Sequence, residues 1–175
     1  MFQTLADLLG VQPTVIIGAI TLLACAVIQY QRTLTWTEYR QYHRLKKRVL
    51  PWLDRVWPHA IHDKGGTDDP EYIATWECSL REAYNILSKA GLEPNLLSSL
   101  KRRPDGLSDL HMVTYHDDGT QTEVYCFTAG ANDRRDVVDV YAHHETATTD
   151  PEGHLSDEQR DGDPRGVLDG IAPAE

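Results

Sequence analysis

The sequence predicts an α+β protein in which an N-terminal transmembrane helix and an amphipathic juxtamembrane helix precede a small domain and a disordered acidic tail. Three observations predict this class. Residues 8–31 carry no charged side chain, residues 34–57 have a helical apolar period, and residues 110–144 alternate like strands around Asp118-Gly119. We expect the domain to contain two helices and a three-stranded antiparallel meander.

These patterns divide the chain into six segments. They are an external stub (1–12), a transmembrane helix (13–33), a basic amphipathic juxtamembrane helix (34–57), a linker (58–69), the α+β domain (70–145) and the tail (146–175). The charge is segregated in the same way: residues 31–58 carry a net charge of +5, although the whole chain carries -10. An acidic body disfavours general nucleic-acid binding, and three cysteines without a CxxC spacing exclude a disulfide scaffold.

The apolar segment is long enough to cross a bilayer. Its core runs from Val15 to Ile28, and Pro13 and Tyr30 extend it to 18 residues. A spanning helix needs about 20 mainly apolar residues, and the crossing can be completed if Arg32 reaches back to the headgroups. Pro13 suits a first helical turn, because its missing N–H would have no partner there.

Cleavage of the apolar segment is an alternative. Ala24-Cys25-Ala26 has the form of a signal peptidase site, and Leu22-Leu23-Ala24-Cys25 resembles a lipobox, which would give an extracytoplasmic lipoprotein. Both kinds of signal start with positive charge, whereas the first nine residues offer only Asp7. Seven Lys and Arg side chains follow the span, so the positive-inside tendency predicts an external N-terminus and a C-terminal domain in the cytoplasm or a virion interior.

Residues 34–57 predict an amphipathic helix that Pro51 should kink or break. Its expected apolar face consists of Tyr39, Tyr42, Leu45, Val49, Trp52, Leu53 and Val56. Two interpretations fit this period equally: the helix lies on an anionic leaflet, or its apolar face packs on its own domain. The residues expected at the membrane interface are Tyr30, Trp36, Arg40, Arg44, Lys46, Lys47 and Arg48.

The domain should begin with a helix from Pro70 to Gly91, since Asp69 is a suitable N-cap. Ile73, Trp76, Leu80 and Leu87 would form its apolar stripe. A shorter helix is expected from Pro94 to Arg102.

A hairpin should follow, because Asp-Gly is a strong turn signal between alternating segments. A two-residue turn at Asp118-Gly119 would pair Val113 with Val124 and His111 with Cys126. After a turn at residues 130–133, a third strand is expected from Asp136 to His144.

Two alternatives depend on this order of elements. His111, Cys126 and His143 or His144 could approach one another, but the chain lacks a metal-ligand motif, so we expect no metal and no cofactor. Residues 94–103 and 110–128 could also form the recognition helix and wing of a membrane-tethered winged-helix DNA-binding regulator. The acidic Asp117-Asp118 at the wing tip disfavours contact with phosphate.

The sequence therefore predicts a single-pass, non-enzymatic interaction or structural protein whose partners are the lipid bilayer and an unidentified protein. We expect no catalytic residues, since no nucleophile–base pair can be named from the sequence. Arg outnumbers Lys twelve to five and Asp outnumbers Glu seventeen to ten. This composition resembles that of salt-adapted proteins of halophilic archaea and their viruses, which suggests a component of a membrane assembly at high salt.

Overall fold

A computed structural model describes residues 10, 12–55, 60–128, 137–148, 164–168 and 171. Most of the expected external stub, the expected turn at 130–133 and much of the tail lie outside these residues. In chain order the elements are α2 (Pro13–Gln31), α3 (Trp36–Leu53), β1 (Ile61–Asp63), β2 (Tyr72–Trp76), α4 (Leu80–Lys89), β3 (Glu93–Pro94), β4 (Leu100–Arg103), β5 (Gly106–Leu107), β6 (Leu110–Tyr115), β7 (Thr120–Thr128), β8 (Val138–Thr146) and the 3-10 helix η1 (Pro164–Val167).

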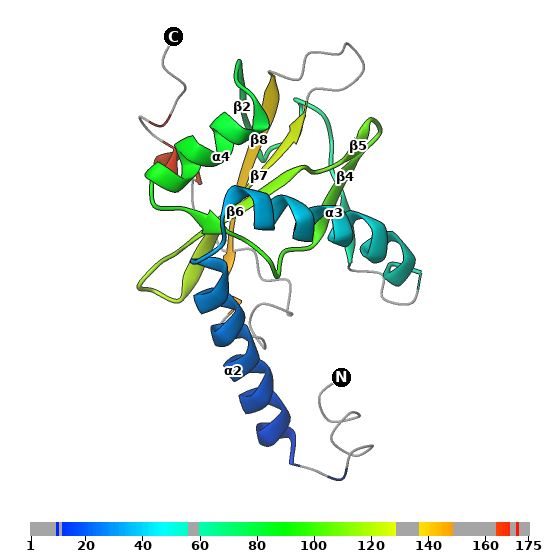
Figure 1. The fold of residues 1–175 in the computed structure, drawn as a ribbon, viewed down its shortest axis with the longest axis vertical. Helices are drawn as coiled ribbons and strands as arrows, with labels where there is room; N and C mark the ends of the chain where they lie inside the picture. The colour runs from blue at the N-terminus through cyan, green and yellow to red at the C-terminus, as the bar shows by residue number, and fades with distance from the viewer. Residues whose placement is uncertain are drawn as a thin grey trace.

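The domain consists of two sheets and the helices around them (Figure 1). The larger sheet has the strand order β2-β8-β7-β6-β3 and is antiparallel throughout, whereas the smaller sheet has the order β1-β4-β5. One face of the larger sheet packs against α4 through Val124, Val140 and Leu87, which belong to one apolar core. The opposite face meets β4, and polar side chains fill the space between them.

The predicted hairpin is present, but its register differs by one residue from the prediction. Val113 pairs with Glu123, and His111 pairs with Tyr125. The loop holds three residues rather than two, because Gly119 has a φ of 81° and the N–H of His116 donates to the carbonyl of Thr120. A type I turn followed by a left-handed glycine adds one residue to the hairpin loop. His111 and Cys126 therefore lie on opposite faces, and the predicted proximity of this pair is wrong.

The predicted helix over 70–91 is wrong in its first half. Residues 72–76 form β2, which pairs with β8, and the helix begins only at Leu80. Its N-cap is Ser79, whose hydroxyl accepts the N–H of Glu82 while the Glu82 carboxylate accepts the N–H of Ser79. Trp76 is buried as expected, but it enters the core from a strand.

The structure also differs from the prediction in the other elements of the domain. Residues 94–102 consist of the end of β3, a stretch without regular secondary structure and most of β4 instead of a second helix, so the winged-helix alternative has no recognition helix. The segment expected to be a linker contains β1, which pairs in parallel with β4. The expected strands over 110–144 are present as β6, β7 and β8, but β2 and β3 flank them, so the sheet has five strands instead of three.

The tail contributes to the domain in the part of it that the structure describes. β8 continues to Thr146, and the Thr148 N–H donates to the side chain of Gln121. Leu168 is buried in the main core, and Val167 and Ile171 pack against that core. The prediction that the whole of 146–175 is disordered is therefore wrong for these residues.

Candidate functional site

The first candidate site is the surface of α2. This helix has 19 residues, and it is long and apolar enough to span a membrane by length and composition. At about 1.5 Å per residue it extends roughly 28 Å, close to the ~30 Å of a hydrocarbon core. One side of its middle does not pack on the domain, since Leu22 is 73% exposed and Leu23 is 66% exposed, whereas Ala24 and Ile28 on the other side are buried. Figure 1 shows α2 projecting away from the two sheets.

The C-terminal end of α2 is fixed to the domain by polar contacts. The side-chain carbonyl of Gln31 accepts the N–H of Leu96 at 3.3 Å, and its amide donates to the Tyr115 hydroxyl at 3.3 Å. Arg32, the next residue, forms a 2.7 Å ion pair with Glu93. Because three segments of the domain hold this end, α2 has a defined direction relative to the sheets.

α3 follows after a short connection and runs across the direction of α2 (Figure 1). Thr35 caps it, since its hydroxyl accepts the N–H of Glu38 and the Glu38 carboxylate accepts the N–H of Thr35. The helix includes Pro51 and ends two residues later, at Leu53, so Pro51 does not break it where the sequence predicted.

α3 packs on its own domain mainly through polar side chains. Tyr39, His43 and Lys46 are its buried residues. The His43 Nε2 donates to the carbonyl of Ser108 at 2.9 Å, and the Lys46 ammonium donates to Ser98 at 2.8 Å. Burial lowers the pKa of His43 to about 3 and that of Lys46 to about 7, so His43 is neutral at neutral pH and Lys46 loses its proton far more readily than an exposed lysine.

The cations expected at the membrane interface divide into two groups. Arg40 donates to the Asp109 carbonyl, Lys47 forms a 2.6 Å ion pair with the Asp109 carboxylate, and Lys46 is buried as described above. Arg44 and Arg48 are exposed, and within the described residues neither forms an ion pair. Two cations of the five are therefore available to an external anion.

The two aromatic residues expected at the interface also differ. Tyr30 is exposed near the end of α2, whereas Trp36, the first residue of α3, packs against the main core with its ring 5.0 Å from that of Tyr84. Only Tyr30 is presented to the surroundings as expected.

The apolar face expected on α3 is mostly not the face that packs. Tyr39 is buried, but Leu45 is 58% exposed and Trp52 is 63% exposed, and Val49 and Tyr42 are also exposed. The reason is that the domain offers carbonyls and hydroxyls to α3, which His43 and Lys46 satisfy better than aliphatic side chains. Leu45, Val49 and Trp52 thus lie outside the packed face, next to Tyr42, whose hydroxyl donates to the carbonyl of Leu96.

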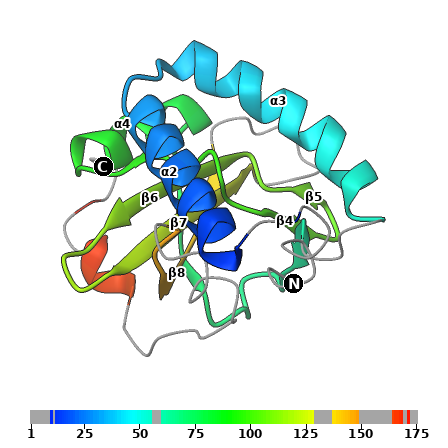
Figure 2. The same ribbon diagram turned by 90° about the horizontal axis from the view of Figure 1, so that it is seen from below.

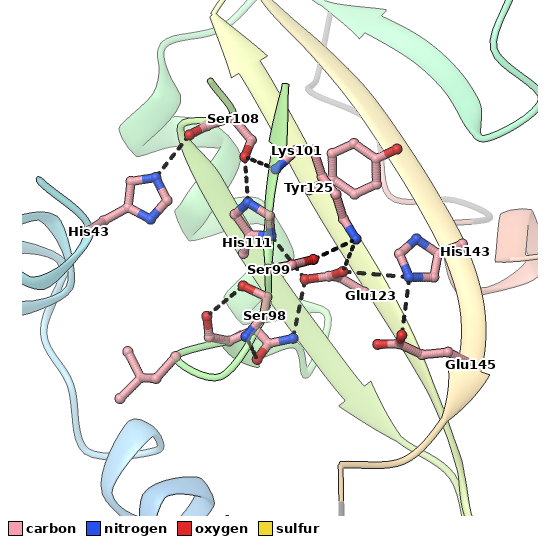
Figure 3. Close-up of polar contacts among 12 residues, drawn as sticks. His43, Ser98, Ser99, Lys101, Ser108, His111, Glu123, Tyr125, His143 and Glu145 are labelled. Carbon is pink, nitrogen blue, oxygen red and sulfur yellow. Dashed lines mark hydrogen bonds and ion pairs between the residues drawn. The ribbon is translucent and has the colours of Figure 1, made fainter. Parts of the chain in front are cut away.

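A second candidate site is a buried ionic cluster between the two sheets (Figure 3). Its centre is Glu123 on β7, which is 1% exposed. The Lys101 ammonium lies 3.2 Å from one carboxylate oxygen, and the His111 Nδ1 lies 2.9 Å from the other. Burial alone would raise the pKa of Glu123, but Lys101, His111 and His143 outweigh it and hold the carboxylate ionised.

His143 extends this cluster toward two more carboxylates. It lies 3.2 Å from Glu71, 3.5 Å from Glu145 and 3.5 Å from Glu123. Burial would lower its pKa, but the nearby carboxylates of Glu145, Glu71 and Glu123 raise it to about 9. His143 is therefore a cation at neutral pH.

The same residues include a possible set of metal ligands. Ligand atoms of Glu123, His143 and Glu145 lie within 4.8 Å of one another. However, Lys101 is already paired with Glu123, and Lys64 is paired with Glu71. Together with protonated His143, these two ammonium groups balance the three carboxylates, so the cluster is neutral without another cation.

The cluster also holds a hydrogen-bonded series that the sequence did not reveal. The Ser108 hydroxyl lies 2.6 Å from the His111 Nε2, and the His111 Nδ1 lies 2.9 Å from Glu123. This is the order of nucleophile, base and carboxylate in serine hydrolases. Here Ser108 and His111 are fully buried, the Ser108 oxygen accepts the N–H of Lys101, and burial lowers the pKa of His111 to about 4. In this arrangement the series links the segment between β5 and β6 to strands β6 and β7.

Comparison with models of protein families, with curated proteins and with solved structures found no match to this chain. The functional conclusion therefore rests on the helices, the exposed apolar side chains of α3 and the cluster described above.

Proposed function

We propose that this protein is a single-pass membrane-anchored, non-enzymatic protein that presents a small α+β domain for interaction or structural support on the inner side of a membrane. The observation that carries the proposal is the exposed apolar surface of α2 around Leu22 and Leu23. Soluble proteins rarely leave so continuous an apolar surface in water, whereas a bilayer covers it without cost.

Two further observations support the placement of the domain on the inner side of the membrane and the assignment to a high-salt environment. The net charge of +5 over residues 31–58 follows the span directly, as expected for a cytoplasmic flank. The acidic, lysine-poor composition suits a membrane assembly at high salt, in a halophilic cell or its virus. In this function the buried cluster around Glu123 is structural, since its charges are balanced within the domain.

Extraction of membranes with alkaline carbonate tests the anchoring. The full chain should stay in the membrane pellet, whereas the variant Leu22→Arg, Leu23→Arg should move to the supernatant. Each arginine near the centre of a span costs about 2.5–3.5 kcal/mol on insertion scales, so the pair is expected to prevent insertion. Thr37→Arg, on the exposed side of α3, is the matched control and should stay in the pellet.

Protease protection tests the orientation. In sealed vesicles that keep the cytoplasmic side inward, added protease should leave the domain intact, and it should digest the domain after the vesicles are opened. Digestion in sealed vesicles would overturn the inner-side placement. Acylation of Cys25 with loss of the preceding residues would instead show the lipoprotein alternative.

A further inference from the structure

We propose that the exposed stripe of α3, formed by Tyr42, Leu45, Val49 and Trp52, inserts into the headgroup layer of the anionic leaflet in which α2 ends. The inference rests on the proposed function and adds the partner of α3, a lipid surface. It makes α3 a second, lateral contact of the domain with the membrane.

The stripe is continuous along the helix. Its members follow one another at intervals of three, four and three residues, which places them on one side of an α-helix. All four are apolar or aromatic side chains and all four are exposed, from 37% at Tyr42 to 63% at Trp52. The buried residues Tyr39, His43 and Lys46 occupy the neighbouring side. Tyr42 borders that packing surface, because its hydroxyl donates to the carbonyl of Leu96, whereas Leu45, Val49 and Trp52 lie outside it.

Hydrogen bonds on the two flanks of α3 fix the direction of the stripe. On one flank, Arg40 and Lys47 contact Asp109. On the other flank, Tyr42 and Lys46 donate to the carbonyl of Leu96.

The carbonyl flank is the one next to α2. The N–H of Leu96 donates to the side chain of Gln31, the last residue of α2. At about 100° per residue, Leu45, Val49 and Trp52 continue round the helix from Tyr42, away from Arg40 and Lys47. The stripe therefore faces the side from which α2 projects.

The arrangement of the helices agrees with this direction. α3 lies across α2 in Figure 1, and in Figure 2, which looks from the side of the α2 N-terminus, no other element covers it. If α2 crosses the bilayer, α3 lies along the plane of the leaflet that contains the Gln31 end. A helix in this position can bury its apolar side between headgroups.

The charges next to the stripe select an anionic leaflet. Arg44 and Arg48 are exposed on the outer side of α3, beside Leu45 and Trp52. Basic side chains near a membrane gain about 1 kcal/mol each from anionic lipids. The rest of the domain is acidic, so an anionic leaflet would repel it and attract only this helix.

Quenching of tryptophan fluorescence by brominated lipid chains tests the proposal in the full chain. The protein is placed in nanodiscs of phosphatidylcholine that contain about one third phosphatidylglycerol, with brominated or ordinary acyl chains. The chain has four tryptophans, so the contribution of Trp52 is the difference between the parent and Trp52→Phe. Trp76→Phe is the matched control, because Trp76 is buried in the core.

We expect Trp52→Phe to lose most of the bromine quenching and Trp76→Phe to retain it. Arg44→Gln with Arg48→Gln should reduce the quenching toward the value in pure phosphatidylcholine. If Trp52 is instead quenched by acrylamide in water and unaffected by brominated chains, the stripe is free for a protein partner or a second copy, and the proposal is overturned. Failure of the chain to enter nanodiscs would refute the proposed membrane anchor itself.

Discussion

The Tyr39 hydroxyl accepts the backbone N–H of His111 at 2.8 Å, and this bond joins α3 to the first residues of β6. β3 pairs only with Met112 and Val113, so the N–H of His111 finds no acceptor on a neighbouring strand. Tyr39 supplies the acceptor from a helix that precedes the domain in sequence. Helix α3 is therefore a structural part of the domain, and the direction of α2 is fixed to the sheets through it.

Tyr39→Phe should destabilise the domain, because it leaves the buried N–H of His111 without an acceptor. We expect a loss of about 1–3 kcal/mol in the free energy of unfolding. Denaturant unfolding of the full chain in detergent measures it. Thr37→Ala, on the exposed side of α3, should change the value by less than about 0.5 kcal/mol. Equal stability of Tyr39→Phe and the parent would show that α3 does not need this bond.

Trp76→Ala should cost about 3–5 kcal/mol, since the side chain is 6% exposed and lies in the main core. Glu77→Ala, at the neighbouring exposed position, is its control and should cost little. Thermal unfolding at high salt, where acidic repulsion is screened, compares the two. A small loss for Trp76→Ala would contradict the packing of β2 against α4.

Leu168→Ala should also reduce stability, by about 2 kcal/mol, because Leu168 fills part of the core from the tail. Gly166→Ala is the control, since a Cβ at Gly166 meets no atom within 4 Å. The midpoint of thermal unfolding gives the difference. If both variants melt like the parent, the contact of the tail with the core does not contribute to stability.

The buried side chain of Lys46 should make the free energy of unfolding depend on pH. Its pKa is lowered to about 7 in the folded protein and has an ordinary value of 10.5 when unfolded. Between these values the unfolded chain binds the extra proton, so the contribution of Lys46 to stability rises with pH. Lys46→Met removes this contribution, so the stability advantage of the variant over the parent should be largest below pH 7 and shrink toward pH 10. Unfolding across this range measures it, and a constant difference would contradict the lowered pKa of the buried amine.

Local patterns in the sequence predicted the elements that depend on neighbouring residues. The uncharged run predicted α2, and the alternation around Asp118-Gly119 predicted the paired strands β6 and β7. The helix over 70–91 failed because Ile73, Trp76 and Leu80 satisfy a helical period, while the capping pair Ser79 and Glu82 marked the true start. Residues 72–76 fit both a helical and a strand period, and pairing with β8 favours the strand.

The candidate sites depended on contacts between residues that are distant in the sequence. Glu123, Lys101 and His143 come from three strands, and a register error of one residue would have placed Glu123 on the wrong face. The apolar period could not predict that His43 and Lys46 are buried in place of Leu45 and Trp52. These two side chains are buried because they donate hydrogen bonds to a carbonyl and a hydroxyl in the segments that connect the β-strands. The exposed stripe could be identified only after this packing was known.

The natural cysteines provide the most direct measurement of the central claim that α2 lies in the bilayer. Cys25 on α2 is exposed in the structure, whereas Cys78 and Cys126 are buried. Membranes opened to both sides are treated with a water-soluble maleimide, which reacts with the thiolate. If α2 spans the bilayer, Cys25 should remain unmodified while Thr37→Cys on α3 is modified rapidly. Modification of Cys25 as fast as that of the cysteine at position 37 would place α2 in water and contradict the account.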